Sequence, residues 1–477
     1  MIDYFSDFVT WFEYFILVFM LIYLSFYLVL AIYSYLAINK NLRVKYDLTN
    51  NKMLKSNQVL GVSVIAPAFN ESANIVYNVK SLLSLLYPKF EVVIVNDGSK
   101  DDTLEILITH FELKKVDFYY EEKVKTNTVR GHYKSTNPIY DKLLVVDKIN
   151  AGSKADASNA GVNSCKYPIF LCTDVDCILK KDTIIKLVYP FMSEKNRVIA
   201  TGAGIRISNS CIVKEGLLKE VRFPREMFPR FQELEYVRSF LFGRMAWSRM
   251  NGLLLVSGGL GMFEKKAFFE VGGYWHDSLG EDLDLVIRLR KLMHEQKEKF
   301  SIRYFAESLC WTEVPASAKI LIRQRSRWSR GLIQSLKIHR KVFFNPKYGI
   351  TGMLVFPYFV FFEFFVPILE LLGLIIIIIS LIFLDINLYF LLYSTLAIFL
   401  FFQSITLISI LIDEFLFKNY NNLKEILILI SISMVEPIVY HPINTFAYLK
   451  GYWLFISKKE LKWGEMTRKG FNTNHQI

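Results

Sequence analysis

Residues 167–176 read YPIFLCTDVD, an apolar run that ends in two aspartates, and this stretch decides the fold class. Short apolar runs bounded by polar residues are typical of strands that are buried on both faces. The same pattern recurs at GVSVIAPAF (61–69), FEVVIVND (90–97), LLVVDK (143–148) and VIATGAG (198–204). Helical periodicity separates most of these runs, at residues 71–86, 101–111, 154–165 and 182–192. The alternation predicts a mostly parallel sheet covered by helices on both faces.

The chain on either side of this α/β region is strongly apolar. Of its 477 residues 52% are hydrophobic and 40 are phenylalanine, concentrated near the N-terminus and beyond residue 350. Residues 14–38 carry no charge and are long enough to cross a bilayer, which predicts a retained anchor. Three more hydrophobic blocks follow at 353–384, at 386–412 and from 426 onward. Because Pro357 and Pro367 lie in the first block, we expect that block to bend.

Charges around these segments predict the orientation of the chain. Acidic residues precede the anchor, whereas Lys40, Arg43 and Lys45 follow it, so the positive-inside rule places the α/β region in the cytoplasm of a plasma-membrane protein. Three full crossings after that region would put the lysine-rich tail outside. The third block is interrupted by Glu436, Pro437, His441 and Pro442. We therefore predict that this block is re-entrant or broken and that the tail is cytoplasmic.

Two segments mix basic and apolar residues, at 223–247 and 318–344, and predict helices that lie at the membrane interface. Ordinary amphipathic core helices are the alternative. The polar segment 123–141 lacks periodicity and predicts a loop. The predicted divisions are an anchor (1–40), a cytosolic catalytic domain (55–317), an interface segment (318–348), a C-terminal membrane region (349–456) and a basic tail (457–477). The net charge of +12 suits a membrane surface and a phosphate-rich ligand. The sequence contains no basic run with interleaved aromatics, so nucleic acid is not expected as a partner.

Polar residues that follow the predicted strands are the first candidates for a binding site, because ligands of such sheets lie beyond the carboxyl ends of the strands. The motif IAPAFNE (65–71) ends in Asn70 and Glu71, whose short polar side chains and exposed backbone can hold a nucleotide base. In VNDGSKDDT (95–103), Asp97 can reach a uracil or a ribose. A helix cap and a plain Asp-Gly turn are the alternatives.

The paired aspartates of LCTDVDC indicate a metal site. Alternate residues of a strand point the same way, so Asp174 and Asp176 are expected to face one site. Two neighbouring carboxylates repel each other unless a cation lies between or beside them, and a hard divalent ion accepts carboxylate and phosphate oxygens. A solvated loop is the alternative. The five cysteines form no CxxC pair, and we interpret them as free thiols.

Two later motifs supply further candidates, the first with acidic residues and the second with an arginine and a tryptophan. LGEDLDLVIRL (279–289) begins a helix with Glu281, Asp282 and Asp284. Acids in a first turn often only complement the helix dipole, but one of them can also deprotonate an attacking sugar hydroxyl. RQRSRWSRG (323–331) supplies Gln324, Arg327 and Trp328, of which the tryptophan can stack on a sugar and the arginine can neutralise a pyrophosphate.

In this order the motifs resemble those of the inverting, membrane-bound glycosyltransferases of family 2, which include the synthases of cellulose, hyaluronan, chitin and poly-β-1,6-N-acetylglucosamine. The resemblance covers roughly residues 60–345. It implies a Rossmann-like GT-A domain combined with transmembrane and interface helices, a nucleoside diphosphate sugar as donor, and Mg²⁺ or Mn²⁺ as cofactor. This chain has Gly280 where the family's base motif carries threonine.

The resemblance also implies a role for each matching residue. The donor nucleotide sugar would be bound by Ala68, Asn70, Glu71, Asp97, Lys154, Asp156, Asp174 and Arg327, with Asn159 nearby. Asp176 would bind the metal and Asp282 would be the catalytic base. The acceptor would rest on the loop at Ser257 and on Gly258, Gly259, Glu281, Gln324 and Trp328. The tail WGEMTRKGF (463–471) is similar to a gating segment, with Thr467 and Lys469 as candidates and a simple basic tail as the alternative.

These expectations predict a processive β-glycan synthase that uses a UDP-sugar and exports its polymer. UDP-glucose, which gives a cellulose-like or mixed-linkage β-glucan, is slightly preferred, and UDP-N-acetylglucosamine fits as well. A membrane enzyme that glycosylates a single lipid is the first alternative, similar to ceramide glucosyltransferase or a polyprenyl-phosphate sugar synthase. A transporter or channel with a regulatory sugar-binding domain is the second. An accessory export subunit is left open.

Overall fold

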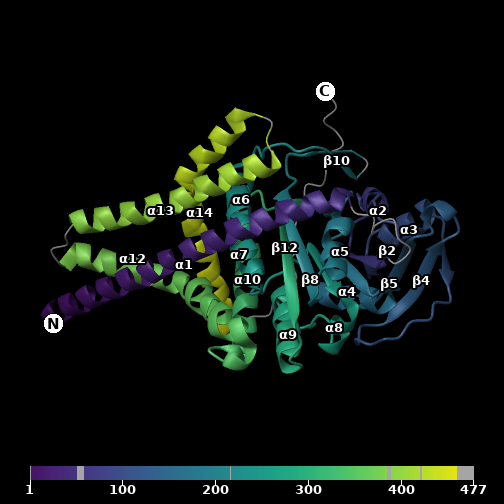
Figure 1. The fold of residues 1–477 in the computed structure, drawn as a ribbon, viewed down its shortest axis with the longest axis horizontal. Coiled ribbons are helices and arrows are strands. Elements are labelled where there is room, and N and C mark those ends of the chain that lie inside the picture. Colours follow the sequence, from purple (N-terminus) through teal and green to yellow (C-terminus); the bar gives the residue numbers. More distant parts are fainter. Residues whose placement is uncertain are drawn as a thin grey trace.

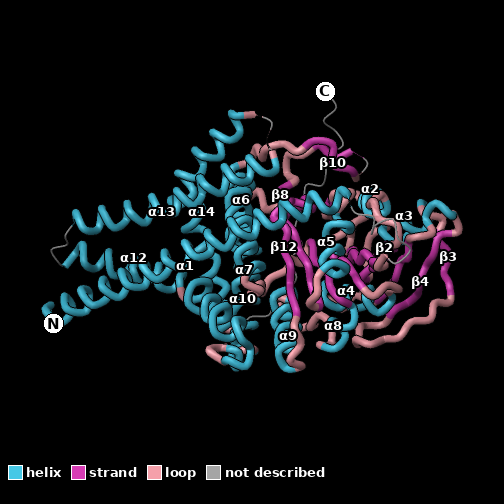
Figure 2. The backbone as a smooth tube through the Cα atoms, in the orientation of Figure 1, coloured by secondary structure: helices cyan, strands magenta, loops and turns pink. Residues whose placement is uncertain are grey.

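The apolar runs form the centre of a ten-stranded sheet with the order β3-β4-β5-β2-β1-β6-β11-β8-β12-β7. The computed structural model describes residues 2–50, 59–214, 216–383, 388–418, 420 and 422–458. Parallel pairing joins β1 (Val62–Ala68) to β2 (Phe90–Asp97) and β6 (Ile169–Thr173), and β2 to β5 (Leu143–Lys148). The prediction of an α/β sheet is confirmed (Figure 2).

The other half of the sheet is mixed. The strand β11 (Leu260–Glu264) runs antiparallel to both β6 and β8 (Arg197–Ile207), whereas β12 (Phe300–Thr312) is parallel to β8. A short antiparallel edge is formed by β7 (Ile178–Leu179). The long strands β1, β2, β5, β6, β8 and β12 therefore share one direction, and their carboxyl ends lie at one edge of the sheet.

The periodic segments between the strands are helices, as predicted. They are α2 (Ile75–Leu83), α3 (Thr103–His110), α4 (Lys154–Ser164) and α5 (Thr183–Ser193), followed later by α8 (Lys265–Glu270) and α9 (Glu281–Glu295). Helix α4 is almost wholly buried against the sheet. A methyl group at Gly161 would lie 2.4 Å from Ile65, so the glycine allows α4 to lie against β1 and fixes the position of its N-terminus.

The prediction of a loop at 123–141 is wrong in part. Residues Val129–Ser135 form β4, which pairs antiparallel with β5 and with β3 (Leu113–Val116) at the sheet edge. Of the seven residues in β4, His132 alone is buried, and the sequence VRGHYKS contains no apolar run that hydropathy could detect. The strand forms because its backbone hydrogen-bonds to β5, and the hydropathy of residues 129–135 does not predict this pairing.

Within the described residues, four helices are long and apolar enough to cross a membrane, by length and composition. They are α1 (Ile2–Asn50), the segment Thr351–Phe383 that ends in α12 (Val366–Phe383), α13 (Leu388–Phe417) and α14 (Leu423–Ile456). In Figure 1, α1, α12 and α13 project together away from the sheet, and the N-terminus lies at their far end. Two π-helical turns, Thr351–Val355 and Phe359–Phe364, interrupt the segment before α12 near the two predicted proline bends.

The predicted break in the last block is not present, because α14 is one continuous helix through Pro437 and Pro442. Proline has no N–H, so Pro437 leaves the carbonyl of Ser433 without its helical donor. Gln403 of α13 donates its Nε2 to that carbonyl at 2.6 Å, and Ser433 Oγ donates back to Gln403 Oε1 at 3.0 Å. A side chain of the neighbouring helix thus replaces the missing bond and keeps α14 intact.

Helix α14 runs across the other three candidate spans in Figure 1 and packs along α6 (Met227–Arg238) and α10 (Ala318–Ile338). Ser326 Oγ of α10 donates to the carbonyl of Ala447 at 2.9 Å, and a methyl group at Gly451 would collide with Ser329. Both predicted interface segments are helical. The segment 223–247 contains α6, a π-helical turn (Ser239–Arg244) and most of α7 (Met245–Arg249).

Buried ion pairs join the α/β domain to the C-terminal helices. Arg206, at the end of β8, pairs with Glu233 of α6 and Asp413 of α13, and all three side chains are less than a tenth exposed. Arg238 of α6 pairs with Glu436 of α14 and donates to Thr406 of α13 at 3.0 Å. Removal of one partner of the Arg206 pairs would leave a buried charge unpaired at a cost of about 3–5 kcal/mol, whereas Arg238 is 30% exposed and its pair is partly screened by solvent.

Candidate active site

The carboxyl ends of the strands open onto a cavity of about 3030 Å³. It is lined by nearly all of the described site residues predicted from the sequence: Ala68, Asn70, Glu71, Asp97, Lys154, Asp174, Asp176, Gly258, Gly259, Glu281, Asp282, Gln324, Arg327 and Trp328. Asp156 is not among the lining residues. Thr467 and Lys469 lie outside the described residues. Motifs that are up to about 260 residues apart therefore meet at one place. The strand-end argument predicts this for the motifs at Asn70, Asp97 and Asp174, whereas the motifs on α9 and α10 were expected there from the family resemblance.

One end of the cavity is built from the turns that follow β1 and β2. Asn70 has a left-handed backbone (φ 55°), a conformation that asparagine tolerates better than most residues. Its Oδ1 accepts from the N–H of Lys100 at 2.8 Å, and its own N–H donates to Ser99 Oγ at 3.0 Å. The N–H of Glu71 donates to Thr103 Oγ1 at 2.9 Å. The two turns are thus bonded to each other and form a preorganised surface beside Asp97.

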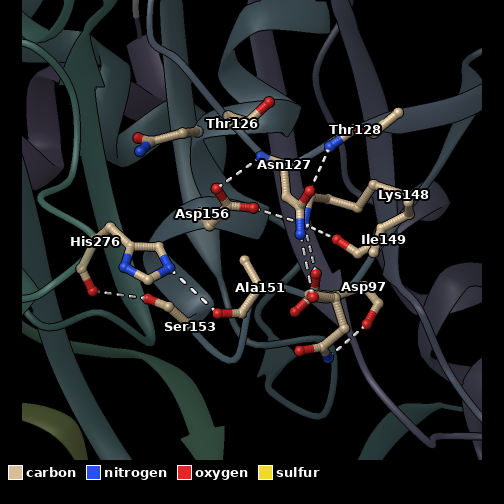
Figure 3. A network of polar contacts seen from close by, with 12 residues as sticks. Asp97, Thr126, Asn127, Thr128, Lys148, Ile149, Ala151, Ser153, Asp156 and His276 are labelled. Carbon is tan, nitrogen blue, oxygen red and sulfur yellow. Dashed lines mark hydrogen bonds and ion pairs between the residues drawn. The ribbon is translucent and has the colours of Figure 1, made fainter.

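Asp97 is paired with a fully buried lysine, Lys148 (Figure 3). Lys148 Nζ contacts Asp97 Oδ1 at 2.8 Å and Asp156 Oδ2 at 2.6 Å, and it donates to the carbonyl of Ile149 at 2.7 Å. Burial raises the pKa of Asp97, and the charge and hydrogen bond of Lys148 offset part of that rise. Asp156 also accepts from the N–H of Asn127 at 3.0 Å. Asp156 thus acts on the site through Lys148.

Lys148 was missed by the sequence analysis. Its signal is an ionisable residue that ends the buried run LLVVDK at the carboxyl end of a strand, where ligands bind. A lysine at such a position needs anionic partners, because an unpaired buried charge is very costly. Its partners lie on β2 and α4, 51 and 8 positions away in the sequence, so hydropathy alone did not identify the network.

Lys154 begins α4 and forms the cationic side of the centre. Its Nζ pairs with Asp174 Oδ1 and donates to the carbonyl of Gly258 at 3.1 Å. Burial alone would lower the pKa of Lys154, but the charge and hydrogen bond of Asp174, together with the nearby Cys172 and Glu281, outweigh burial and hold the pKa above its ordinary value. The ammonium group therefore stays charged near neutral pH and lies where an anionic group can approach it.

Three possible ligand atoms lie within 4.8 Å of one another on Asp174, Asp176 and Cys177. The two carboxylates fit a hard divalent ion whose other ligands are water or phosphate oxygens. A thiol is a soft ligand and suits Mg²⁺ poorly, so Cys177 is the least fitting member of the set. Cys177 was not predicted as a site residue. The five cysteines are free thiols, as expected, and four of them are buried.

The acidic motif at the start of α9 lies opposite this centre. The N–H of Gly258 donates to Asp282 Oδ2 at 3.4 Å, and Asp282 Oδ1 accepts from the N–H of Leu283 at 2.9 Å. Burial and then the charge of Asp282 raise the pKa of the neighbouring Glu281, against the opposing effect of Arg327 and Lys154. Gly258 thus lies between Asp282 and Lys154, because its N–H donates to Asp282 and its carbonyl accepts from Lys154.

Asp284 anchors this helix from the side that faces away from the cavity. It is 1% exposed and accepts from His339 Nε2 and from Arg288 Nε, each at 2.8 Å. Burial alone would raise the pKa of Asp284, but these two partners hold it below the usual range. Of the three acids at the start of α9, Glu281 and Asp282 line the cavity and Asp284 is structural.

The α10 motif places Gln324, Arg327 and Trp328 on the cavity wall. Trp328 is 37% exposed, and the guanidinium of Arg325 lies 4.1 Å from the centre of its ring. Arg325 is itself buried and pairs with Glu235 of α6 at 2.8 Å. The sequence analysis did not select Arg325, although its place inside the motif was a signal. It holds the tryptophan by cation–π contact.

Two family models match the chain, Glycosyl transferase family 2 over residues 63–253 and Glycosyl transferase family group 2 over residues 221–402. A poly-β-1,6-N-acetyl-D-glucosamine synthase of Staphylococcus epidermidis is 29% identical over 275 residues, or 57% of this chain and 55% of that protein. The synthase of Staphylococcus aureus (strain COL) is 25% identical over 289 residues, or 60% of this chain and 58% of that protein. The chain thus spans about half the length of the curated relatives it matches.

Among solved structures, the mannosyltransferase PcManGT from Pyrobaculum calidifontis, in complex with GDP-Man and Mn²⁺, has a TM-score of 0.48 and 14% sequence identity. The match covers 91% of this chain and 99% of that one. The family matches and the mixed α/β sheet confirm the prediction of a GT-A domain combined with helices that could cross a membrane.

Proposed function

Because two models of glycosyltransferase family 2 match consecutive parts of the chain, we propose that it is a membrane synthase that adds N-acetylglucosamine units from UDP-N-acetylglucosamine to a growing β-linked polymer. The observation that carries the proposal is the meeting of Lys154, the Asp174–Asp176 pair and Asp282 around Gly258. The choice of sugar rests on the staphylococcal relatives, which are named as poly-β-1,6-N-acetyl-D-glucosamine synthases. The earlier preference for UDP-glucose and a cellulose-like product receives no support and is withdrawn.

At the donor end, the nucleoside is proposed to lie on the bonded turns at Ala68, Asn70 and Glu71, with Asp97 at the uridine. Lys148 fixes the position of Asp97 by its 2.8 Å ion pair, so the carboxylate is oriented before the donor arrives. A preorganised polar surface of this kind lowers the ordering cost of binding.

The departing diphosphate is proposed to lie between Lys154, Arg327 and the acidic pair. Asp174 and Asp176 would hold a divalent cation, which neutralises charge on a leaving diphosphate when it is bound. Lys154 now pairs with Asp174, and an arriving phosphate would share the ammonium group with that carboxylate. Fixed positive groups act strongly in a cavity that excludes water, because charges interact more strongly there than in water.

At the acceptor end, Asp282 is proposed to remove the proton from the attacking sugar hydroxyl. Its Oδ2 accepts from the N–H of Gly258 at 3.4 Å, so the carboxylate lies beside the loop on which the acceptor sugar is proposed to rest, with Gly259 and Trp328 on the same cavity wall. An acceptor that attacks from the side opposite the leaving diphosphate inverts the anomeric carbon, so an α-linked donor gives a β-linked product.

Polymer growth would use the part of the cavity that continues between the helices. Its wall there includes Tyr23 and Tyr27 of α1, Glu370 of α12, and His441 and Tyr448 of α14. His441 Nε2 and Glu370 Oε1 lie 2.8 Å apart. Hydroxyl groups such as those of Tyr23 and Tyr27 are costly on a helix that crosses a membrane unless they face a polar path, and a sugar chain would supply such a path.

We place the catalytic domain in the cytoplasm, with three crossings: α1, Thr351–Phe383 and α13. The far ends of these helices lie together, away from the domain (Figure 1). Helix α14 contacts α6 and α10 along most of its length: Glu436 pairs with Arg238, and Lys337 lies 5.7 Å from the ring of Phe455. A helix with such charged partners fits the boundary of the membrane better than its interior. Three crossings also leave the basic tail inside.

Cysteine labelling tests this arrangement of α14. Lys424→Cys and Ser457→Cys lie beside the two ends of the helix and are both expected to react with an impermeant maleimide in inside-out vesicles, whereas Asp7→Cys is expected to react in right-side-out vesicles. A helix that crosses the membrane would place one of the α14 cysteines on the outer side, and that result would refute the three-crossing topology.

Product formation by the purified protein tests the proposed reaction. UDP-N-acetylglucosamine and UDP-glucose are supplied separately with Mg²⁺ or Mn²⁺, and the products are sized and digested with linkage-specific glycosidases. We expect high-molecular-weight product from UDP-N-acetylglucosamine, loss of product with EDTA or in Asp282→Asn, and full activity in the exposed control Asp117→Asn. A glycolipid as the main product would overturn the polymer assignment, and polymer from UDP-glucose alone would overturn the sugar assignment.

A further inference from the structure

The loop at residues 271–280 joins α8 to α9 and ends one residue before the Glu281–Asp282 pair. It starts with two left-handed glycines, Gly272 (φ 79°) and Gly273 (φ 72°), which favour a sharp turn and give the chain little stiffness of its own. The position of Asp282 therefore depends on what holds this loop from outside.

The donor side of the site holds the first half of the loop. Asn159 of α4 donates its Nδ2 to the carbonyl of Tyr274 at 2.8 Å and accepts from the N–H of Tyr274 at 2.9 Å. Ser153 Oγ donates to the carbonyl of His276 at 3.2 Å, and His276 Nε2 lies 3.2 Å from the carbonyl of Ala151 (Figure 3). These bonds tie the loop to the segment that carries Lys154.

Helix α10 holds the second half. Gln334 Oε1 accepts from the N–H of Leu279 at 2.9 Å, and Gln334 Nε2 donates to the carbonyl of Asp277 at 2.8 Å. Gly331 packs directly on Gly280, because a methyl group at Gly331 would lie 2.8 Å from the Gly280 nitrogen. Both ends of the Gln334 carboxamide are used, so the side chain fixes the loop in two directions.

The residues of this contact share one face of α10. Arg327, Gly331 and Gln334 follow one another at spacings of four and three, which places them on one side of a helix. The side of α10 that faces the cavity with Arg327 therefore also contacts the loop that precedes Asp282, through Gly331 and Gln334. The Asp284–His339 bond at 2.8 Å ties α9 to the end of α10 on the other side of Asp282.

From this arrangement we infer that Gln334 is a positioning residue, which sets the place of Asp282 relative to the donor by clamping residues 277–279 onto α10. The inference rests on the proposed function, because it assigns Asp282 the role of the base. Gln334 itself does not line the cavity. A misplacement of about 1 Å at a reacting group can cost about a hundredfold in rate, so loss of the clamp is expected to lower kcat about 10- to 100-fold.

The test compares Gln334→Met with Gln296→Met. Methionine keeps the length of glutamine and removes both hydrogen bonds. Gln296 is exposed beyond the other end of α9 and makes one 3.4 Å contact with Glu270, so it is a control of identical chemistry. We expect Gln334→Met to lower kcat while the KM for UDP-N-acetylglucosamine changes less than about twofold, since the donor surface is left intact. Equal kcat values for the two variants would overturn the inference.

Hydrogen exchange provides a readout that does not depend on catalysis. In Gln334→Met the amides of residues 277–283 are expected to exchange faster than in wild type, and in Gln296→Met at the wild-type rate. Unchanged exchange would overturn the clamp. If the wild type makes no polymer but the exchange difference is found, the clamp stands and the proposed function fails, so the two failures are distinguishable.

Gln334→Glu provides a second variant of nearly the same shape. The ionised glutamate that is present at about pH 7.5 offers no donor to the carbonyl of Asp277. We therefore expect Gln334→Glu to lower kcat at this pH as Gln334→Met does. A wild-type kcat in Gln334→Glu would contradict the hydrogen-bond account of Gln334.

Discussion

Replacement of Lys148 by methionine is expected to destabilise the α/β domain and to weaken donor binding. Lys148 is fully buried and neutralises Asp97 and Asp156, both of which are less than a tenth exposed. Methionine has a similar volume, so little packing is lost, and the change leaves two buried carboxylates without their cation. Loss of one partner of a buried ion pair costs about 3–5 kcal/mol.

This cost predicts a large fall in the melting temperature. For a domain of about 150–250 residues, 1 kcal/mol shifts Tm by about 2–4 °C, so the expected fall is about 6–20 °C. The exposed control Lys114→Met is expected to change the free energy of unfolding by less than about 0.5 kcal/mol. The measurement is thermal unfolding of the purified protein in detergent, followed by tryptophan fluorescence.

The pH dependence separates a charge effect from a packing effect. Burial already raises the pKa of Asp97, and removal of Lys148 would raise it further. A carboxyl group whose pKa is higher in the folded than in the unfolded state makes the folded state bind protons more tightly, so stability rises as the pH falls through the folded pKa. The deficit of Lys148→Met is therefore expected to shrink in acid.

A compensating variant completes the design. Asp97→Asn and Asp156→Asn, added to Lys148→Met, remove the buried charges and are expected to restore much of the lost stability while leaving donor binding weak. The reasoning is refuted if Lys148→Met unfolds within about 1 kcal/mol of wild type at pH 7.5, or if its deficit is the same at pH 5.5, because either result means that buried charge is not what the lysine neutralises.

Three further predictions concern other acids of the site. Asp282→Asn is expected to lower kcat by at least about 10²-fold while UDP-N-acetylglucosamine still binds, as measured by calorimetry, because amides cannot accept the hydroxyl proton. Asp176→Asn is expected to raise the concentration of Mn²⁺ that gives half-maximal activity by at least about tenfold, since one hard ligand is lost; an unchanged metal titration would contradict the assignment. Asp284→Asn is expected to cost roughly 3 kcal/mol at pH 7 by breaking the pairs with His339 and Arg288. Since the pKa of Asp284 lies below its usual range, its contribution is present above the unfolded pKa and is lost as the pH falls through the folded pKa, so the wild-type and variant melting curves should converge in acid.

The sequence by itself determined the sheet, the helices that cover it and the residues that meet at its edge. Short apolar runs are typical of strands buried on both faces, and parallel strands bring their carboxyl ends together, so Asp97 and Asp174 were expected at one edge of the sheet before any contact was known. Asp282 begins a helix, and it was expected at the same place from the family resemblance. The order of the motifs also indicated the family, because each motif is a local pattern of residue types that can be read from the sequence. The roles of these residues remain proposals, which the experiments above test.

Only the tertiary structure decided which groups pair and where α14 lies. Lys148 meets Asp97 at a separation of 51 residues, Arg325 meets Glu235 at 90, and Arg238 meets Glu436 at 198. Hydropathy reports how strongly a segment avoids water, but it does not report which partner satisfies a charge or in which direction a helix runs. At Pro437 a side chain of the neighbouring helix α13 replaces the missing bond of α14, and the strand β4 pairs with β5. Both features are stabilised by hydrogen bonds to segments that the local sequence does not specify.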